Sequence, residues 1–284
     1  MEKVSVIIPT FNREKTIERA ILSVLNQTYE NLECLVIDDG SSDRTKDILH
    51  SIDDSRLKIY FLEKNSGVSA ARNFGVRQSR GDWVALLDSD DEWLPNKLEI
   101  QLSYSKKNPE IPLIHGEEIW IRKGKRVNAK KIHKKSGGKI FSRCLHLCLI
   151  SPSATLMKKS LYEEMKGFNE EYPVCEDYEL WLRITSQYEI GFIEDPIIVK
   201  YGGHEDQLST KYKAMDFWRV KAMDEVSTFV ELNKKDSLEL RRVLLKKCKI
   251  LKAGYIKHDN LSQLPFIEQL IKKYSLPVDQ NDDS

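Results

Sequence analysis

Residues 83–93 of the chain read WVALLDSDDEW, an apolar run that ends abruptly in four acidic side chains. Carboxylates packed this closely repel one another, and one like-charge pair at about 4 Å costs roughly 4 kcal/mol at an effective dielectric near 20. The apolar half is typical of a buried strand. Such a cluster is tolerated either in full contact with water or around a shared cation.

The first hundred residues alternate between strand-like and helix-like hydrophobic periods. Strands that alternate with helices predict a parallel sheet with helices on both faces, and such sheets bind ligands at the carboxyl ends of their strands. The predicted strands are 3–9, 32–40, 56–63 and 83–88. The residues at their carboxyl ends are therefore the candidates for a site: Pro9, Thr10, Phe11, Asp38, Asp39, Gly40, Asn65, Ser66, Asp88, Ser89 and Asp90.

After residue 95 this regular alternation ends. The sequence predicts, in chain order, a helix (96–109), a hairpin turned at Gly124 (113–127), a helix, turn, strand and helix (144–165), an acidic loop and helix (167–188), two strands (190–204), and helices from about 206 onward. The basic stretch 122–139 is either a solvated loop or a contact for an acceptor or an anionic surface.

Composition narrows the class of protein. The chain has 284 residues, 40% hydrophobic and 31% charged, and its net charge of +1 gives no reason to expect nucleic-acid binding. Its apolar runs have strand length, and its first residues lack a secretory pattern, so we expect a cytoplasmic protein. Five scattered cysteines fit a reducing compartment. Cys144 and Cys148 could share a helix face as metal ligands, but without a second pair we favour core packing.

Five stretches extend the pattern well beyond the acid cluster: VSVIIPTFNRE (4–14), SVLNQTYENLECLVIDDGSSDRT (23–45), NSGVSAARNFG (65–75), GDWVALLDSDDEWLPNKL (81–98) and CEDYELWLRI (175–184). In order and spacing they resemble glycosyltransferase family 2. The resemblance implies the α/β GT-A fold, a Rossmann-like, mixed and mainly parallel sheet flanked by helices, here with a C-terminal helical extension. It also implies an inverting, hexosyltransferase-like enzyme that moves a sugar from a nucleoside-diphosphate sugar to an acceptor hydroxyl in surface-glycan or polysaccharide synthesis.

Carried over position by position, the resemblance assigns the acids of the opening stretch to a metal ion, Mn²⁺ or Mg²⁺. Asp90 would hold the ion that bridges the diphosphate, and Asp88 would contact the ribose or metal-bound water. Hard carboxylate oxygens suit either ion, which would neutralise charge on the departing diphosphate. By spacing alone, Asp-x-Asp is also a common polar loop. The implied nucleotide-binding residues, with Asp39 at the pyrimidine edge, are Pro9, Thr10, Phe11, Arg13, Asp39, Arg72 and Asp88.

The Glu176-Asp177 pair matches the family's Glu-Asp motif at the start of a helix. It implies the base that deprotonates the acceptor hydroxyl, with Asp177 preferred and Glu176 as the alternative. Acids at this position also complement a helix dipole without any catalytic role. His204 follows two glycines and resembles a position that ligates the metal or contacts phosphate, although an ordinary surface histidine is equally open.

We expect a GT-A catalytic domain in residues 1–205, divided into a nucleotide-binding half (1–98) and an acceptor half (99–205), and a helical region in 206–284. A UDP-sugar is the default donor, with dTDP- and GDP-sugars open, and the acceptor is a glycan or a lipid-linked saccharide. Residues 241–258 are basic and amphipathic. They could lie peripherally on the inner face of a membrane, although packing on the core is favoured.

Other functional classes carry recognisable signatures. A non-catalytic nucleotide-sugar binding protein would have lost the base or the metal acid, and neither is lost here. A doubly wound signalling domain with a phosphorylated aspartate would have about half this length and no helix at 175–184. The absence of GxxxxGK[ST] and GxGxxG argues against a P-loop NTPase and a nicotinamide enzyme.

Overall fold

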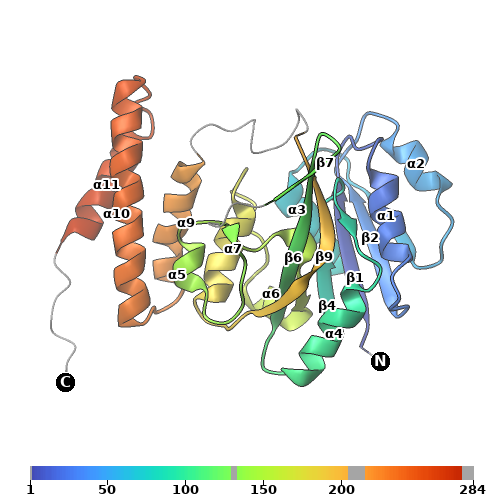
Figure 1. Ribbon diagram of the computed structural model, residues 1–284. Helices are drawn as coiled ribbons and strands as arrows, with labels where there is room; N and C mark the ends of the chain where they lie inside the picture. The colour runs from blue at the N-terminus through green and yellow to red at the C-terminus, as the bar shows by residue number, and fades with distance from the viewer. Residues whose placement is uncertain (1, 129–132, 204–214, 277–284) are drawn as a thin grey trace.

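The computed structural model describes residues 2–128, 133–203 and 215–276. In this part of the chain, one mixed sheet has the strand order β3-β2-β1-β4-β8-β6-β9-β5, and β7 pairs with β6. Helices cover both of its faces, and a group of three helices extends the molecule at one end (Figure 1). The α/β fold with a C-terminal helical extension is therefore confirmed.

The N-terminal half is the predicted parallel unit. Its strands are β1 (Val4–Thr10), β2 (Leu32–Asp38), β3 (Leu57–Phe61) and β4 (Trp83–Leu86), with α1 (Ile17–Leu25), α2 (Thr45–Ser51) and α3 (Val68–Gln78) between them. Strand β1 pairs in parallel with both β2 and β4, and Thr10 lies level with Asp38. The carboxyl ends of these strands therefore meet at one edge of the sheet.

Alternate residues of these strands enter two different cores, because successive side chains of a strand point to opposite faces. Ile7 and Ile37 pack on the side of α3, whereas Val6 and Ile8 pack on the side of α1. A Cβ atom at Gly75 of α3 would lie 2.5 Å from Ile7 Cγ2, so only glycine lets this helix lie so close to the sheet. Each buried Ile or Val stabilises the fold by roughly 1.5–3 kcal/mol.

The second half adds antiparallel pairs to the sheet. In chain order it contains β5 (Glu92–Trp93), α4 (Lys97–Lys107), β6 (Leu113–Arg122), β7 (Lys125–Val127), α5 (Phe141–Cys144), β8 (Leu156–Lys158), α6 (Lys159–Glu164), α7 (Glu176–Thr185) and β9 (Gly191–Gly202). The hairpin at Gly124 is confirmed. The expectation of two strands in 190–204 is wrong, because β9 is one strand whose register against β6 shifts around Glu117, opposite Pro196. A bulge of this kind tolerates proline inside a strand.

Helices α9 (Asp216–Phe229), α10 (Lys234–Lys257) and α11 (Leu264–Ser275) form the group at the end of the molecule (Figure 1). Helix α9 packs on α7 and α10 packs on α9, and their buried side chains belong to the same apolar cluster as α7. The favoured packing of residues 241–258 is thus confirmed. No helix of the described residues is long and apolar enough to cross a membrane. The domain division at residue 205 stays a prediction.

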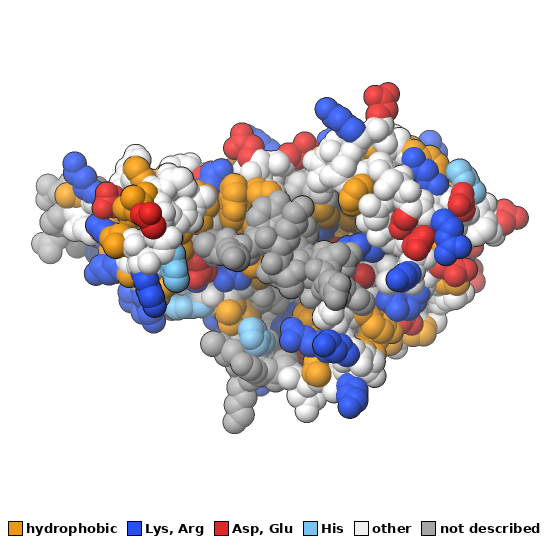
Figure 2. Space-filling model, turned by 90° about the horizontal axis from the view of Figure 1, so that it is seen from above, with side chains coloured by type: hydrophobic (Ala, Val, Ile, Leu, Met, Phe, Trp, Pro, Cys, Tyr) orange, Lys and Arg blue, Asp and Glu red, His pale blue; other side chains and the backbone are white. Residues whose placement is uncertain are grey.

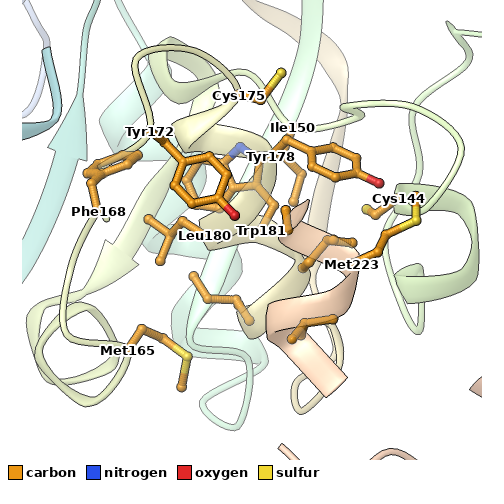
Figure 3. Packing of buried hydrophobic residues seen from close by; sticks show 14 of the residues in the cluster. Cys144, Ile150, Met165, Phe168, Tyr172, Cys175, Tyr178, Leu180, Trp181 and Met223 are labelled. Atoms are coloured by element: carbon orange, nitrogen blue, oxygen red, sulfur yellow. The ribbon is translucent and has the colours of Figure 1, made fainter. Parts of the chain in front are cut away.

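Helix α7 is the centre of this apolar cluster. Figure 3 shows Tyr178, Leu180 and Trp181 packed among side chains from several elements, including Met223 of α9. Trp181 and Trp93 are 1% and 2% exposed, so both are packing residues. The helix begins directly after Cys175, whose φ of 62° is left-handed and unusual for a residue with a Cβ atom.

One buried lysine joins α4 to the neighbouring strands. Lys97 is fully buried, and its Nζ donates to Gln101 Oε1 at 2.7 Å and to the carbonyl oxygen of Thr155 at 3.1 Å. Its amine also lies 3.9 Å from the centre of the Trp93 ring. Burial lowers the pKa of Lys97 well below its ordinary value, so folding favours the neutral amine.

We expect Lys97→Met to reduce the rise of stability with pH. The unfolded wild-type chain binds a proton at Lys97 more tightly than the folded chain does. The free energy of unfolding therefore increases with pH, by up to about 1.4 kcal/mol per pH unit between the two pKa values. Urea unfolding at pH 7, 8 and 9 measures this slope, with Lys107→Met at the exposed end of α4 as the control. Parallel curves for wild type and Lys97→Met would show that the folded protein keeps this amine charged.

Candidate active site

A cleft of about 1860 Å³ opens at the carboxyl ends of β1, β2 and β4. The first residues of α3 and α7, the β6–β9 pair and the first turn of α9 complete its walls. Most of the predicted site residues line this cleft: Pro9, Thr10, Phe11, Arg13, Asp39, Asn65, Ser66, Arg72, Asp88, Ser89, Asp90, Glu176 and Asp177. Asp38 and Gly40, which were also expected at the strand ends, are not among its lining residues. His204 lies outside the described residues.

The loops after β1 and β2 shape one end of the cleft. The carboxylate of Asp39 accepts hydrogen bonds from the backbone N–H groups of Ser66 and Gly67, both at 2.8 Å, and so fixes the turn into α3. Burial raises the pKa of Asp39 even though these two bonds act against the rise. Phe11, at 41% exposure, presents an aromatic face beside this turn. This end of the cleft thus combines a flat apolar surface with backbone and carboxylate groups.

Arg72 connects two acidic motifs that lie 88 residues apart in the chain. The side chain comes from α3 and is 3% exposed, and its two terminal nitrogens bind Asp88 Oδ1 at 2.7 Å and Glu176 Oε1 at 2.8 Å. Burial lowers the pKa of the guanidinium, but the charges of Asp88 and Glu176 outweigh it and raise the pKa. Arg72 therefore makes buried ion pairs rather than a surface salt bridge.

Lys200, which is half-buried, supplies a second cation from β9. Its ammonium lies 3.2 Å from Asp91 Oδ2, and Asp91 also accepts a 2.6 Å hydrogen bond from the Ser153 hydroxyl. Burial lowers the pKa of Lys200, but the charges of the surrounding carboxylates, led by Asp91 and Asp88, have the larger combined effect. The net result is a raised pKa. Burial raises the pKa of Asp91 to about 7, against the attraction of Lys200. Two of the crowded aspartates thus have a protein cation as a partner.

Asp90 is the remaining acid of the cluster that faces the cleft. Its carboxylate has no hydrogen bond or ion pair with any residue in the described ranges, while its backbone carbonyl accepts a 2.6 Å bond from Arg19. Burial and the charge of Asp88 raise the pKa of Asp90. This partly buried oxygen pair is the place in the cluster where a further cation would relieve repulsion.

The acids at the start of α7 have different surroundings. The carboxylate of Glu176 is buried against Arg72, and burial together with the charge of Asp177 raises its pKa to about 7. Asp177 is more exposed, and its Oδ2 accepts a hydrogen bond from the Cys148 thiol at 3.3 Å. Glu176 is thus occupied by an internal ion pair, whereas Asp177 lies in the cleft with only a weak thiol donor on that oxygen.

A divalent ion fits Asp90 and Asp88, although no ready-made metal cage exists in the described part of the chain. The carboxylate of Asp90 has no side-chain partner within the described ranges, and Arg72 engages only Oδ1 of Asp88. Magnesium or manganese commonly takes one or two carboxylates and completes its shell with water and substrate phosphates. The carboxylate oxygens of Asp90 and Asp88 are hard donors of this kind. The residues predicted to bind the metal are therefore chemically suited to it.

Several residues around the cleft were missed at the sequence level. Lys200 interrupts the apolar run IIVKYGG, so a lone charge in a predicted strand was the available signal. Ser153, which also accepts a hydrogen bond from the Asp88 backbone N–H at 3.1 Å, gave no signal at all. Cys148 lies beyond α5 rather than on a helix with Cys144, and only Cys144 is a core residue as expected.

Comparison with known proteins identifies the family. Residues 5–166 match the family model described as Glycosyl transferase family 2. The chain belongs to glycosyltransferase family 2. An Escherichia coli relative, the UDP-Glc:α-D-GlcNAc-diphosphoundecaprenol β-1,3-glucosyltransferase WfgD, is 35% identical over 80% of this chain and 87% of its own length. The aligned part of the chain covers only 27% to 47% of the length of four other relatives.

Solved structures of other glycosyltransferases share the fold. S. aureus TarS 1–349 in complex with UDP-GlcNAc superposes with a TM-score of 0.72 over 96% of this chain and 80% of that chain, at 19% identity. The Pyrobaculum calidifontis mannosyltransferase PcManGT, in complex with GDP-Man and Mn²⁺, gives 0.62 over 96% and 84%, at 15% identity. At these identities the likeness establishes the GT-A fold alone, as the sequence predicted.

We expect Arg72→Met to destabilise this glycosyltransferase strongly, because it leaves the carboxylates of Asp88 and Glu176 buried without their cation. Breaking a buried ion pair in this way costs about 3–5 kcal/mol. Arg77→Met, at an exposed position on the same helix, should change stability by less than about 0.5 kcal/mol. Urea unfolding of the two variants measures the difference. Equal effects would contradict the role of Arg72 as the buried link between the motifs.

Proposed function

We propose that the protein transfers a sugar, with inversion, from a UDP-sugar to a hydroxyl of a lipid-linked saccharide during surface-glycan synthesis. The observation that carries this proposal is one cleft that contains both the Asp88–Asp90 acids and the Glu176–Asp177 acids. The E. coli relative is named for a UDP-glucose donor and a diphosphoundecaprenol-linked acceptor, and TarS was solved with UDP-GlcNAc. Both names support UDP as the carrier and favour it over dTDP or GDP.

The donor occupies the end of the cleft formed by β1, β2 and α3. Pro9, Thr10 and Phe11 provide a backbone edge and an aromatic face for the base and ribose, and Asp39 reads the pyrimidine edge. Both Asp39 oxygens already accept backbone bonds, but a carboxylate has capacity for about four. Arg13 lines the same end, and its backbone N–H is fixed by the Thr45 hydroxyl at 2.8 Å.

Asp90 and Asp88 hold Mn²⁺ or Mg²⁺ when the donor is bound. The ion supplies Lewis-acid stabilisation of the charge that develops on the departing diphosphate. Arg72 and Lys200 hold the carboxylates of Asp88 and Asp91 in place through ion pairs, so the cluster retains its shape before and after the donor arrives. His204, outside the described residues, remains a candidate for a further ligand.

Asp177 acts as the general base that takes the proton from the acceptor hydroxyl. Glu176 is the weaker candidate because its carboxylate is committed to Arg72 and is buried, whereas Asp177 is open to the cleft. In an inverting transfer the acceptor oxygen attacks the anomeric carbon from the side opposite the departing diphosphate. Arg72 keeps the two acidic motifs of this reaction at a fixed separation, since one guanidinium contacts both.

The donor side is tested by thermal unfolding with UDP, GDP, dTDP, CDP or ADP, each with and without Mn²⁺. A nucleotide at 100 times its dissociation constant adds roughly 2.7 kcal/mol of stability, which raises the midpoint by several degrees. We expect UDP to act only with Mn²⁺ and Asp90→Asn to abolish the shift, while Asp53→Asn, at an exposed position, retains it. Absence of a shift with all five nucleotides, with and without metal, would contradict the proposal.

The base is tested with UDP-glucose as donor and a synthetic GlcNAc-diphospho-lipid as acceptor, by following UDP release. We expect Asp177→Asn to lower the rate between about a hundredfold and ten-thousandfold while leaving the UDP-dependent thermal shift intact. The exposed control Asp195→Asn should behave as wild type. Near-normal turnover by Asp177→Asn would exclude it as the base, and UDP binding without turnover in wild type would favour the non-catalytic alternative.

A further inference from the structure

Helix α10 has two chemically different faces. One face is buried against α9, α11 and α5 and is almost entirely apolar. The opposite face is exposed, and we define its outer arc by Arg242, Lys246, Lys249, Ile250, Ile256 and Lys257. At 100° per residue these six side chains fall within about 120° of the helix circumference. The outer arc is therefore a continuous surface stripe of mixed cationic and apolar character.

Helix α10 is much more positively charged than the molecule as a whole. The helix carries nine lysine or arginine residues and two acidic residues, in a chain whose formal net charge is +1. Within the outer arc, Arg242 pairs with Glu239, whereas Lys246, Lys249 and Lys257 make no ion pair with any residue that the structure describes. The space-filling view from above shows Lys and Arg side chains at this end of the molecule, next to apolar and acidic ones (Figure 2). Most of the positive charge of the arc is therefore available to an external anion.

The apolar members of the arc are unusually open to water. Ile250 is 61% and Ile256 is 57% exposed, and they form the two edges of the arc, each next to a lysine in the sequence. A helix that lies in the interface of a membrane requires this mixture, because its cations meet lipid phosphates while its aliphatic side chains enter the acyl boundary.

We propose that the outer arc of α10 docks the protein on a membrane surface that carries anionic lipids. A second copy of the chain is a poor partner, because a two-fold contact would set the same cations against one another. A nucleic acid would use the lysines but would gain nothing from Ile250 and Ile256. In Figure 1 the carboxyl end of α10 lies on the same side of the molecule as the carboxyl ends of the parallel strands. Docking through this arc would place the opening of the cleft beside the membrane. None of the residues of the arc belongs to the candidate active site.

Flotation of the full chain with phosphatidylcholine vesicles, with and without phosphatidylglycerol, tests the docking surface. We expect the protein to float with the anionic vesicles and to partition at least about tenfold less into pure phosphatidylcholine. Lys246→Glu/Lys249→Glu should reduce the anionic partitioning by more than about tenfold. Lys106→Glu/Lys107→Glu, which makes the same charge change at the far end of α4, should leave most of it intact.

Ile250→Ser/Ile256→Ser separates membrane docking from simple attraction to a polyanion, because it leaves the charge unchanged. We expect this variant to lose most of its binding to anionic vesicles. Three results would each overturn the proposal. They are full vesicle binding by Ile250→Ser/Ile256→Ser, a loss of binding in the α4 control equal to that in the α10 charge variant, and failure of the wild-type protein to float with anionic vesicles. The UDP-dependent thermal shift, measured on every variant, reports the fold and the donor site separately, so failure of docking is distinct from failure of the proposed transfer.

Discussion

Two cations, the buried Arg72 and the half-buried Lys200, set the charge balance on which the rest of the site depends. The acidic side chains of residues 88–92 lie close enough in the sequence to repel one another. The structure reduces this repulsion by pairing Asp88 with Arg72 and Asp91 with Lys200. The carboxylate of Asp90 has no ion pair with another described residue, and burial together with the charge of Asp88 raises its pKa. An external cation would therefore relieve repulsion at one aspartate of the cluster, and not at the whole group.

The same interactions make the cleft rigid. Arg72 joins the end of β4 to the start of α7, while the Asp91–Lys200 pair joins the acid loop to β9. The left-handed backbone of Cys175 is held in place where α7 begins, and such local strain persists only when the surrounding packing fixes it. The dense apolar cluster around α7 and α9 provides that packing, so the C-terminal helices support the position of Glu176 and Asp177.

Much of this arrangement could be predicted from local sequence. The parallel half follows from hydrophobic periods, and the location of the site follows because strand ends such as Thr10, Asp39 and Asp88 share one edge. Long-range pairing was not accessible. Nothing local indicates that Lys200 meets Asp91 or that Cys148 meets Asp177, and the bulge opposite Pro196 depends on the partner strand β6. The buried state of Arg72 likewise arises from tertiary packing.

The most direct test of this charge balance is a titration of Mn²⁺ into the protein, with free Mn²⁺ measured by electron paramagnetic resonance, in the absence and presence of UDP. Because a single aspartate lacks a protein cation, we predict weak binding of Mn²⁺ alone and at least about tenfold tighter binding when the diphosphate completes the coordination shell. Equally tight Mn²⁺ binding with and without UDP would contradict the account, since it would require an acid cluster that Arg72 and Lys200 have not already neutralised.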